Sequence, residues 1–188
     1  MLTSAQRVVG QSLTVTVKRP GTLDSDYLWT PFRSDANFEP SWWNEPRYRD
    51  DTYQYLEFRL DDTEVARVAL GQDSVTDHYA TAPPLGDEAL EIQLIEVSSA
   101  LRRRHIATDV VHMIGGANPQ RRLLAFSEEA DHFWASLDWD RHDHPAGPAF
   151  YRPLFIQPEK LAVKPLGDRP SIMDRTRRRP GGGPGRKT

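Results

Sequence analysis

The residues best suited to chemistry lie in a basic turn between a predicted strand and a predicted helix. The turn contains three consecutive arginines, Arg102, Arg103 and Arg104, followed by His105. The first turn of a helix presents backbone N–H groups without intrahelical acceptors, at the positive end of the helix dipole. Arginines add long-range attraction for a polyanion. The turn therefore predicts a binding site for a ligand that carries phosphate.

The strand before this turn, residues 89–97, changes the face on which its apolar residues lie. Apolar residues occupy one face as far as Leu94, whereas Ile95 and Val97 are apolar on the other face. Such a change of phase indicates a bulge or a splayed strand. A splayed edge exposes backbone N–H and C=O groups to which an extended amide ligand can pair. Pantetheine is such a ligand, and in coenzyme A it is joined to a pyrophosphate.

The turn resembles the CoA-binding motif of the GNAT (GCN5-related N-acetyltransferase) superfamily, Q/R-x-x-G-x-G/A. The residues RRRHIA match it at Arg102 and Ala107 and depart from it at His105, where the family usually has glycine. The resemblance extends over roughly residues 52–156 and is strongest to bacterial members.

A second motif of the family, N-x-x-A-x-x-x-Y-x-x-L-G-F, resembles residues 127–139, SEEADHFWASLDW. The match holds at Ala130, Leu137 and Trp139. The departures are Ser127, Trp134 and Asp138.

The resemblance implies that the protein uses acetyl-CoA as a co-substrate. It further implies transfer of the acetyl group to a primary amine of a small molecule or a protein by direct attack on the thioester. The residues expected to bind acetyl-CoA are Ile95, Val97, Arg102, Arg103, Arg104, His105, Ile106, Ala107, Thr108, Ser127 and Trp134. No metal is expected, because the His- and Asp-rich residues 138–144 are more typical of a polar loop.

Two carboxylates are candidate bases for the amine. Glu91 stands where some family members place a catalytic glutamate, and on a mostly apolar strand it would be partly desolvated and so a better base. The alternative is a solvated or salt-bridged Glu91. Glu96 is the second candidate base.

The family's usual acid is a tyrosine at the position of Trp134, and an indole cannot act as an acid. Water, a histidine or Tyr151 would then protonate the thiolate.

The predicted elements that position these residues indicate an α+β fold. From residue 52 the order is β-β-β-α-β-α-β-β, which implies a mixed, mostly antiparallel central sheet with flanking helices, a GNAT-like α/β sandwich. Gly115 and Gly116 are expected to end the first helix, and Ser127 to cap the second. Residues 19–51 are broken by prolines and rich in aromatics, so we expect an irregular, ordered segment that covers this protein's core or a partner's. A homodimer is therefore left open.

Composition limits the remaining classes of function. Hydrophobic residues make up 38% and there is no cysteine, which excludes disulfides and thiolate zinc sites. Residues 1–164 are expected to form one domain and residues 165–188 a disordered tail with seven basic and two acidic residues. No signal sequence or membrane span is predicted, so a cytoplasmic location is expected. Nucleic acid would be contacted only weakly, through the tail.

Two alternatives to an active acetyltransferase stay open. The departures at His105, Ser127 and Trp134 favour a degenerate GNAT domain that acts as an acyl-CoA-binding or protein-interaction module. An acetyltransferase toxin acting on aminoacyl-tRNA would need a basic face, and the acidic body opposes it.

Overall fold

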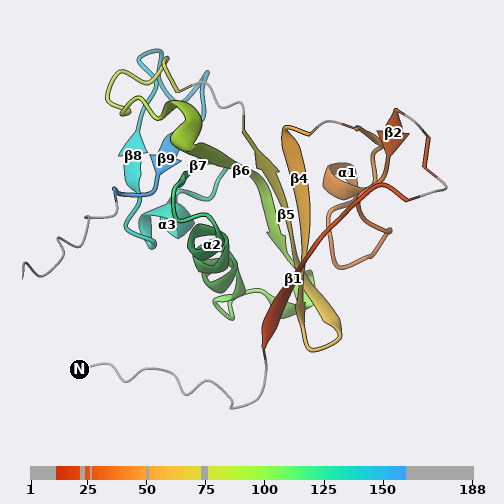
Figure 1. The fold of residues 1–188 in the computed structure, drawn as a ribbon. Helices are drawn as coiled ribbons and strands as arrows, with labels where there is room; N and C mark the ends of the chain where they lie inside the picture. Colours follow the sequence, from red (N-terminus) through yellow and green to blue (C-terminus); the bar gives the residue numbers. More distant parts are fainter. Residues whose placement is uncertain (1–11, 22–23, 26, 50, 73–75, 160–188) are drawn as a thin grey trace, which may run out of the picture.

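The computed structural model describes residues 12–21, 24–25, 27–49, 51–72 and 76–159 (Figure 1). The predicted basic tail, residues 165–188, lies outside the described residues, as do residues 1–11 and 160–164 at the ends of the predicted domain.

A seven-stranded sheet forms the centre of the protein. Its strands, in spatial order, are β1 (Leu13–Val17), β4 (Tyr53–Leu60), β5 (Thr63–Gly71), β6 (Ala89–Val97), β7 (Arg122–Phe126), β9 (Leu154–Ile156) and β8 (Asp140–His142). All neighbours are antiparallel except β6 and β7, which are parallel and joined by the crossover helix α2 (Ile106–Ala117). The predicted α+β class, with a mixed and mostly antiparallel central sheet, is thus confirmed.

Two layers cover the sheet, one on each face (Figure 1). Helices α2 and α3 (Asp131–Ala135) pack on one face, where Val110, Val111 and Trp134 join the main core. Short 3-10 helices, η1 (Gly86–Glu88) and η2 (Ser99–Leu101), flank β6 at its two ends. In the part of the chain that the structure describes, no helix is long and apolar enough to cross a membrane.

The aromatic segment covers the opposite face of this chain's own sheet. It contains β2 (Leu28–Trp29), α1 (Pro40–Trp43) and β3 (Arg47–Tyr48). Its buried side chains, which pack on Tyr55 and Ala69, are Trp29, Phe32, Phe38 and Trp43. In the described part of this segment the regular elements are two to four residues long, and Tyr27 and Tyr48 are exposed.

A buried arginine fixes this segment on the sheet. The guanidinium of Arg67 on β5 lies over the rings of Phe32 and Phe38, 4.8 and 4.1 Å from their centroids. It also pairs with Glu64 at 2.7 Å and donates to the carbonyl of Arg33 at 3.0 Å. Stacking and pairing together compensate the desolvation of this charge.

Two predicted helix boundaries are wrong. Gly115 and Gly116 lie inside α2, because glycine is only disfavoured in a helix by about 1 kcal/mol and is not excluded from it. The stop comes from Asn118, whose backbone N–H and side-chain amide both donate to the carbonyl of Ile114, at 3.1 and 2.8 Å.

The predicted cap of the second helix is also wrong. Ser127 does not cap α3, because Glu129 adopts a left-handed backbone with φ 57° and separates the serine from the helix. Its hydroxyl instead donates to the carboxylate of Asp131 at 2.5 Å.

Candidate functional site

Strand β6 contains both the bulge and the splay that its residue pattern predicts. Opposite β5, Ala69 pairs with Leu94 and Leu70 pairs with Ile92, so Gln93 is an extra residue. On the other side, β7 pairs with β6 only from Ala89 to Glu91 among the described residues. Beyond Glu91 the two parallel strands separate, and the edge of β6 faces an opening between the strands.

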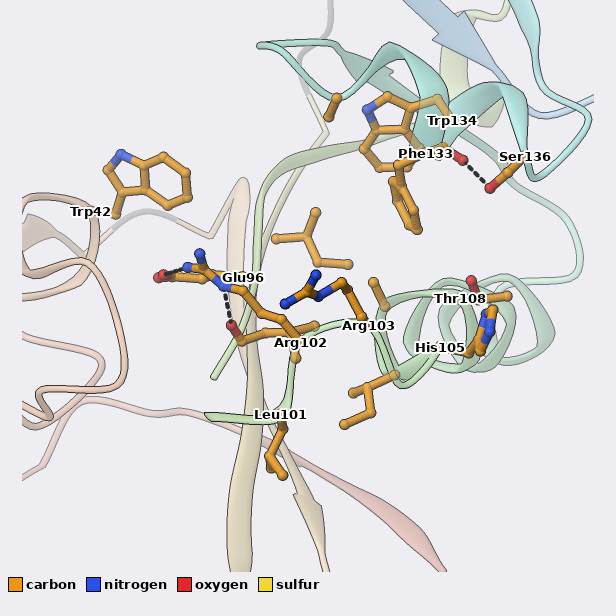
Figure 2. A pocket seen from close by; sticks show the side chains of 15 residues that line it. Trp42, Glu96, Leu101, Arg102, Arg103, His105, Thr108, Phe133, Trp134 and Ser136 are labelled. Atoms are coloured by element: carbon orange, nitrogen blue, oxygen red, sulfur yellow. Dashed lines mark hydrogen bonds and ion pairs between the residues drawn. The ribbon is translucent and has the colours of Figure 1, made fainter. Parts of the chain in front are cut away.

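A cavity of about 630 Å³ lies at the wide end of this opening (Figure 2). We call it the first cavity. Nine of the eleven predicted acetyl-CoA-binding residues line it, namely Ile95, Val97, Arg102, Arg103, His105, Ile106, Ala107, Thr108 and Trp134. Its remaining walls include Trp42 from α1 and Phe133 from α3. Its size falls within the range of small-molecule sites, about 300–1,000 Å³.

The turn before α2 has two residues with left-handed backbone. Arg103 has φ 63°, and His105, the residue before the helix, has φ 61° and ψ 13°. Glycine adopts this conformation without penalty, whereas a side chain costs about 1–2 kcal/mol. The resembled motif has glycine at His105, and the backbone here keeps the geometry for which glycine is suited. No side chain of the described residues caps α2, and the first residues of the helix, Ile106 to Thr108, line the first cavity.

The three arginines of the turn have different positions. Arg103 projects into the first cavity in Figure 2. Arg102 lines it as well, and its guanidinium pairs with Glu96 at 3.2 Å. Arg104 is exposed and does not line the cavity, so the structure does not bring it together with the other predicted residues.

Glu96 is buried and serves as a structural acceptor. Its carboxylate accepts hydrogen bonds from the indole N–H of Trp43 at 2.7 Å and from the backbone N–H of Glu39 at 3.0 Å. With the Arg102 pair, these bonds join β6, the aromatic segment and the basic turn. Because these hydrogen bonds reach three separate parts of the chain, the carboxylate is suited to positioning the wall of the cavity.

Trp134 and Ser127 differ in their access to the cavity. Trp134 stacks on Trp139 with centroids 4.9 Å apart, and its ring closes one end of the first cavity. Ser127 is buried beside Asp131 and does not line the cavity. Ser127 is therefore placed to support α3, at a distance from any ligand in the first cavity.

Glu91 lines a second cavity, of about 380 Å³, near the narrow end of the splay. It is half-buried and is the last residue of β6 that pairs with both neighbouring strands. The other lining residues are His78, Tyr79, Gln93, Phe126, His144, Phe150, Tyr151 and Arg152. Apart from Tyr151 and Glu91, the sequence pattern did not indicate these residues as a site, because they come from two strands and two loops that are distant in the chain.

A narrow passage of about 80 Å³ lies between the two cavities. It shares Trp42, Ile95, Ala130 and Trp134 with the first cavity, and Gln93, Phe126 and Arg152 with the second. The passage follows β6 from residue 92 to residue 95. The three spaces therefore lie in series along this strand, and we call this series the β6 route.

This route fits the chemistry of an acyl-CoA. The amides at the start of α2 and the guanidinium of Arg103 suit a pyrophosphate, and the edge of β6 offers peptide groups to an amide chain. Within the described residues, no group of three or more His, Cys, Asp or Glu side chains converges to hold a metal ion.

Comparison with known proteins finds similarity of structure alone. No protein-family model and no curated protein sequence matches the chain. An acetyltransferase from Thermus thermophilus matches with a TM-score of 0.45 and 11% identity, over 58% of this chain and 66% of that protein's own length. An acetoin utilization protein from Exiguobacterium sibiricum matches with a TM-score of 0.42 and 12% identity, over 80% and 88% of the two chains. A bacterial toxin matches with a TM-score of 0.43 and 15% identity, over 57% and 68%. These three likenesses are distant, and none of them reaches a TM-score of 0.5.

Proposed function

We propose that the protein is an N-acyltransferase that binds acetyl-CoA in the first cavity and transfers the acetyl group to a primary amine. The observation that carries this proposal is the series of three cavities along splayed β6. The basic turn before α2 lies at one end of this β6 route and Glu91 lies at the other.

The residues of the first cavity would hold the phosphate end of the co-substrate. Arg103 and the first amides of α2 supply positive potential, and Ile95 and Val97 supply apolar contact beside the strand edge. Glu96 holds Arg102 against β6, which keeps the basic turn in register with the strand. In this reading Glu96 is a positioning residue, and Glu91 alone remains the base.

The second cavity would hold the amine. Glu91 takes the proton of the ammonium, directly or through water, and leaves the nitrogen lone pair free to react. The nitrogen then attacks the thioester carbon and a C–N bond forms. The nitrogen gives up its second proton to water, the C–S bond breaks, and the thiolate leaves with the bonding electron pair. Trp134 cannot supply a proton to that thiolate, so the proton comes from Tyr151 or from water.

The first test compares two charge reversals in the same turn. Arg103→Glu is expected to weaken acetyl-CoA binding at least tenfold in calorimetric titration, because it places a negative charge in the cavity. Arg104→Glu changes the net charge equally and serves as the matched control, with an expected loss of about threefold or less because exposed charges are screened.

Two results would count against the proposal. Equal losses in both variants would mean that the turn attracts the ligand without a formed site. No binding of acetyl-CoA to the unmodified protein would favour the degenerate interaction module. If binding is present, Glu91→Gln should keep the affinity and lower kcat by about 10²-fold or more.

A further inference from the structure

A row of aromatic rings lines the second cavity. We use the name aromatic row for Phe126, Tyr79, His144 and Tyr151. Tyr79 contacts Phe126 and His144, with centroids 5.6 and 5.4 Å apart. His144 stacks on Tyr151 at 3.7 Å with an interplanar angle of 24°. The row draws on β7 and on two loops, so tertiary contacts assemble it.

Hydrogen bonding fixes the centre of the row. The hydroxyl of Tyr79 donates to the carbonyl of Arg152 at 2.7 Å, which holds its buried ring in one orientation. Burial, together with the nearby Tyr151, raises the pKa of Tyr79, so its hydroxyl stays a neutral donor. The rings therefore form a rigid wall, whereas Tyr151 and Phe150 are exposed at its entrance.

The charges around the second cavity favour a cation. Glu91 contributes a carboxylate to the lining. Arg152 also lines it, and its guanidinium pairs with Glu128 at 2.6 Å. An ammonium group beside Glu91 is favoured by the carboxylate and by the faces of neighbouring rings.

We propose that the second cavity binds a small primary amine carried on an aromatic or flat apolar body. The aromatic row covers the ring of this acceptor, and Glu91 receives its ammonium group. A cavity of about 380 Å³ has room for one small molecule, and stacking on fixed rings selects a flat one. This inference rests on the proposed function for the transfer step, whereas binding of the amine can be measured separately.

The experiment measures binding of four probes to the full chain by ligand-observed NMR titration, without acetyl-CoA. The probes are 2-phenylethylamine, n-hexylamine, 3-phenylpropionate and spermidine. 2-Phenylethylamine is expected to bind about tenfold more tightly than n-hexylamine, which lacks the ring, and than 3-phenylpropionate, which lacks the ammonium. Spermidine tests a linear polycation.

Two tyrosine variants report whether the probe uses the aromatic row. Tyr151→Ala is expected to weaken 2-phenylethylamine about five- to tenfold, and because this side chain is half-exposed the fold should not depend on it. Tyr48→Ala, at an exposed tyrosine on β3, is the matched control and should leave the affinity unchanged.

The outcomes separate this inference from the proposed function. Equal binding of n-hexylamine, tightest binding of spermidine, or an unchanged Tyr151→Ala variant would overturn the aromatic acceptor. If acetyl-CoA binds in calorimetry and none of the amines does, this inference fails and the proposed function survives. If 2-phenylethylamine binds and acetyl-CoA does not, the proposed function fails and the aromatic amine site survives.

Discussion

Replacement of Glu96 by glutamine tests whether this carboxylate holds the site together. The carboxylate is 6% exposed and accepts bonds from Trp43, Glu39 and Arg102. A glutamine has one acceptor oxygen, and its NH₂ group must face a donor whichever way the amide turns. An unsatisfied buried donor costs about 1–3 kcal/mol, and loss of charge assistance costs about 1 kcal/mol more. The Arg102 pair adds little, because that side chain is 60% exposed.

The expected loss of unfolding free energy for Glu96→Gln is therefore about 3 kcal/mol. For a domain of this size that loss lowers Tm by about 6–12 °C. Circular dichroism during heating and urea unfolding would measure the two quantities. Asp143→Asn is the control, because Asp143 is an exposed acid paired with exposed Arg141, and its loss should stay below about 1 kcal/mol.

A double variant decides between a structural and a catalytic Glu96. Trp43→Phe removes the indole donor, so the losses in Trp43→Phe and Glu96→Gln should be less than additive when the two are combined. A variant Glu96→Gln with unchanged Tm and a large loss of kcat would refute the reasoning and restore Glu96 as a base.

Two further predictions concern backbone strain and acid stability. His105→Gly should raise the unfolding free energy by about 0.5–1 kcal/mol in urea titration, because glycine adopts the left-handed backbone conformation of this position without strain. The control His112→Gly, inside α2, should lower the unfolding free energy by about 1 kcal/mol. Burial raises the pKa of Glu57, but bonds from Lys18 and Arg59 outweigh it and keep the pKa below 4.5. Glu57 therefore stabilises the fold above about pH 4.5 and loses this effect as the pH falls through its folded pKa. Tm measured between about pH 3 and 6 should depend less on pH in Glu57→Gln, and an unchanged profile would contradict this.

Local patterns predicted the part of the site that lies on regular elements. The predicted change of phase indicated the bulge of β6, but its place was wrong: the extra residue is Gln93, so Leu94 packs with the aromatic segment and Ile95 packs with the main core. The arginines before Ile106 predicted an anion site at a helix start. Both patterns are made of a few adjacent residues, and the local backbone geometry they predict depends on residues that are close in the chain. Strand β6 therefore has the bounds that its pattern predicts.

Contacts between distant residues could not be predicted in this way. The bond from Trp43 to Glu96 joins residues 53 positions apart, and no spacing rule links an indole in a proline-rich segment to a strand carboxylate. The aromatic row has the same origin, because Tyr79 and His144 meet only when two loops close over β7. Helix α2 continues past Gly115 because its packing on the sheet outweighs the low helix propensity of glycine.

The extra residue in β6, Gln93, lets the strand pack on the core and still border the opening beside β7. Leu90 and Ile92 face the helices before Gln93, and Ile95 and Val97 face them after it. If Gln93 were deleted, Leu94 would follow Ile92 directly, and every apolar side chain would keep the face it has now. The strand is thus one residue longer than the packing of its neighbours requires. A regular strand without Gln93 would satisfy the core equally well, so the extra residue changes the pairing of the strand without changing which side chains reach the interior.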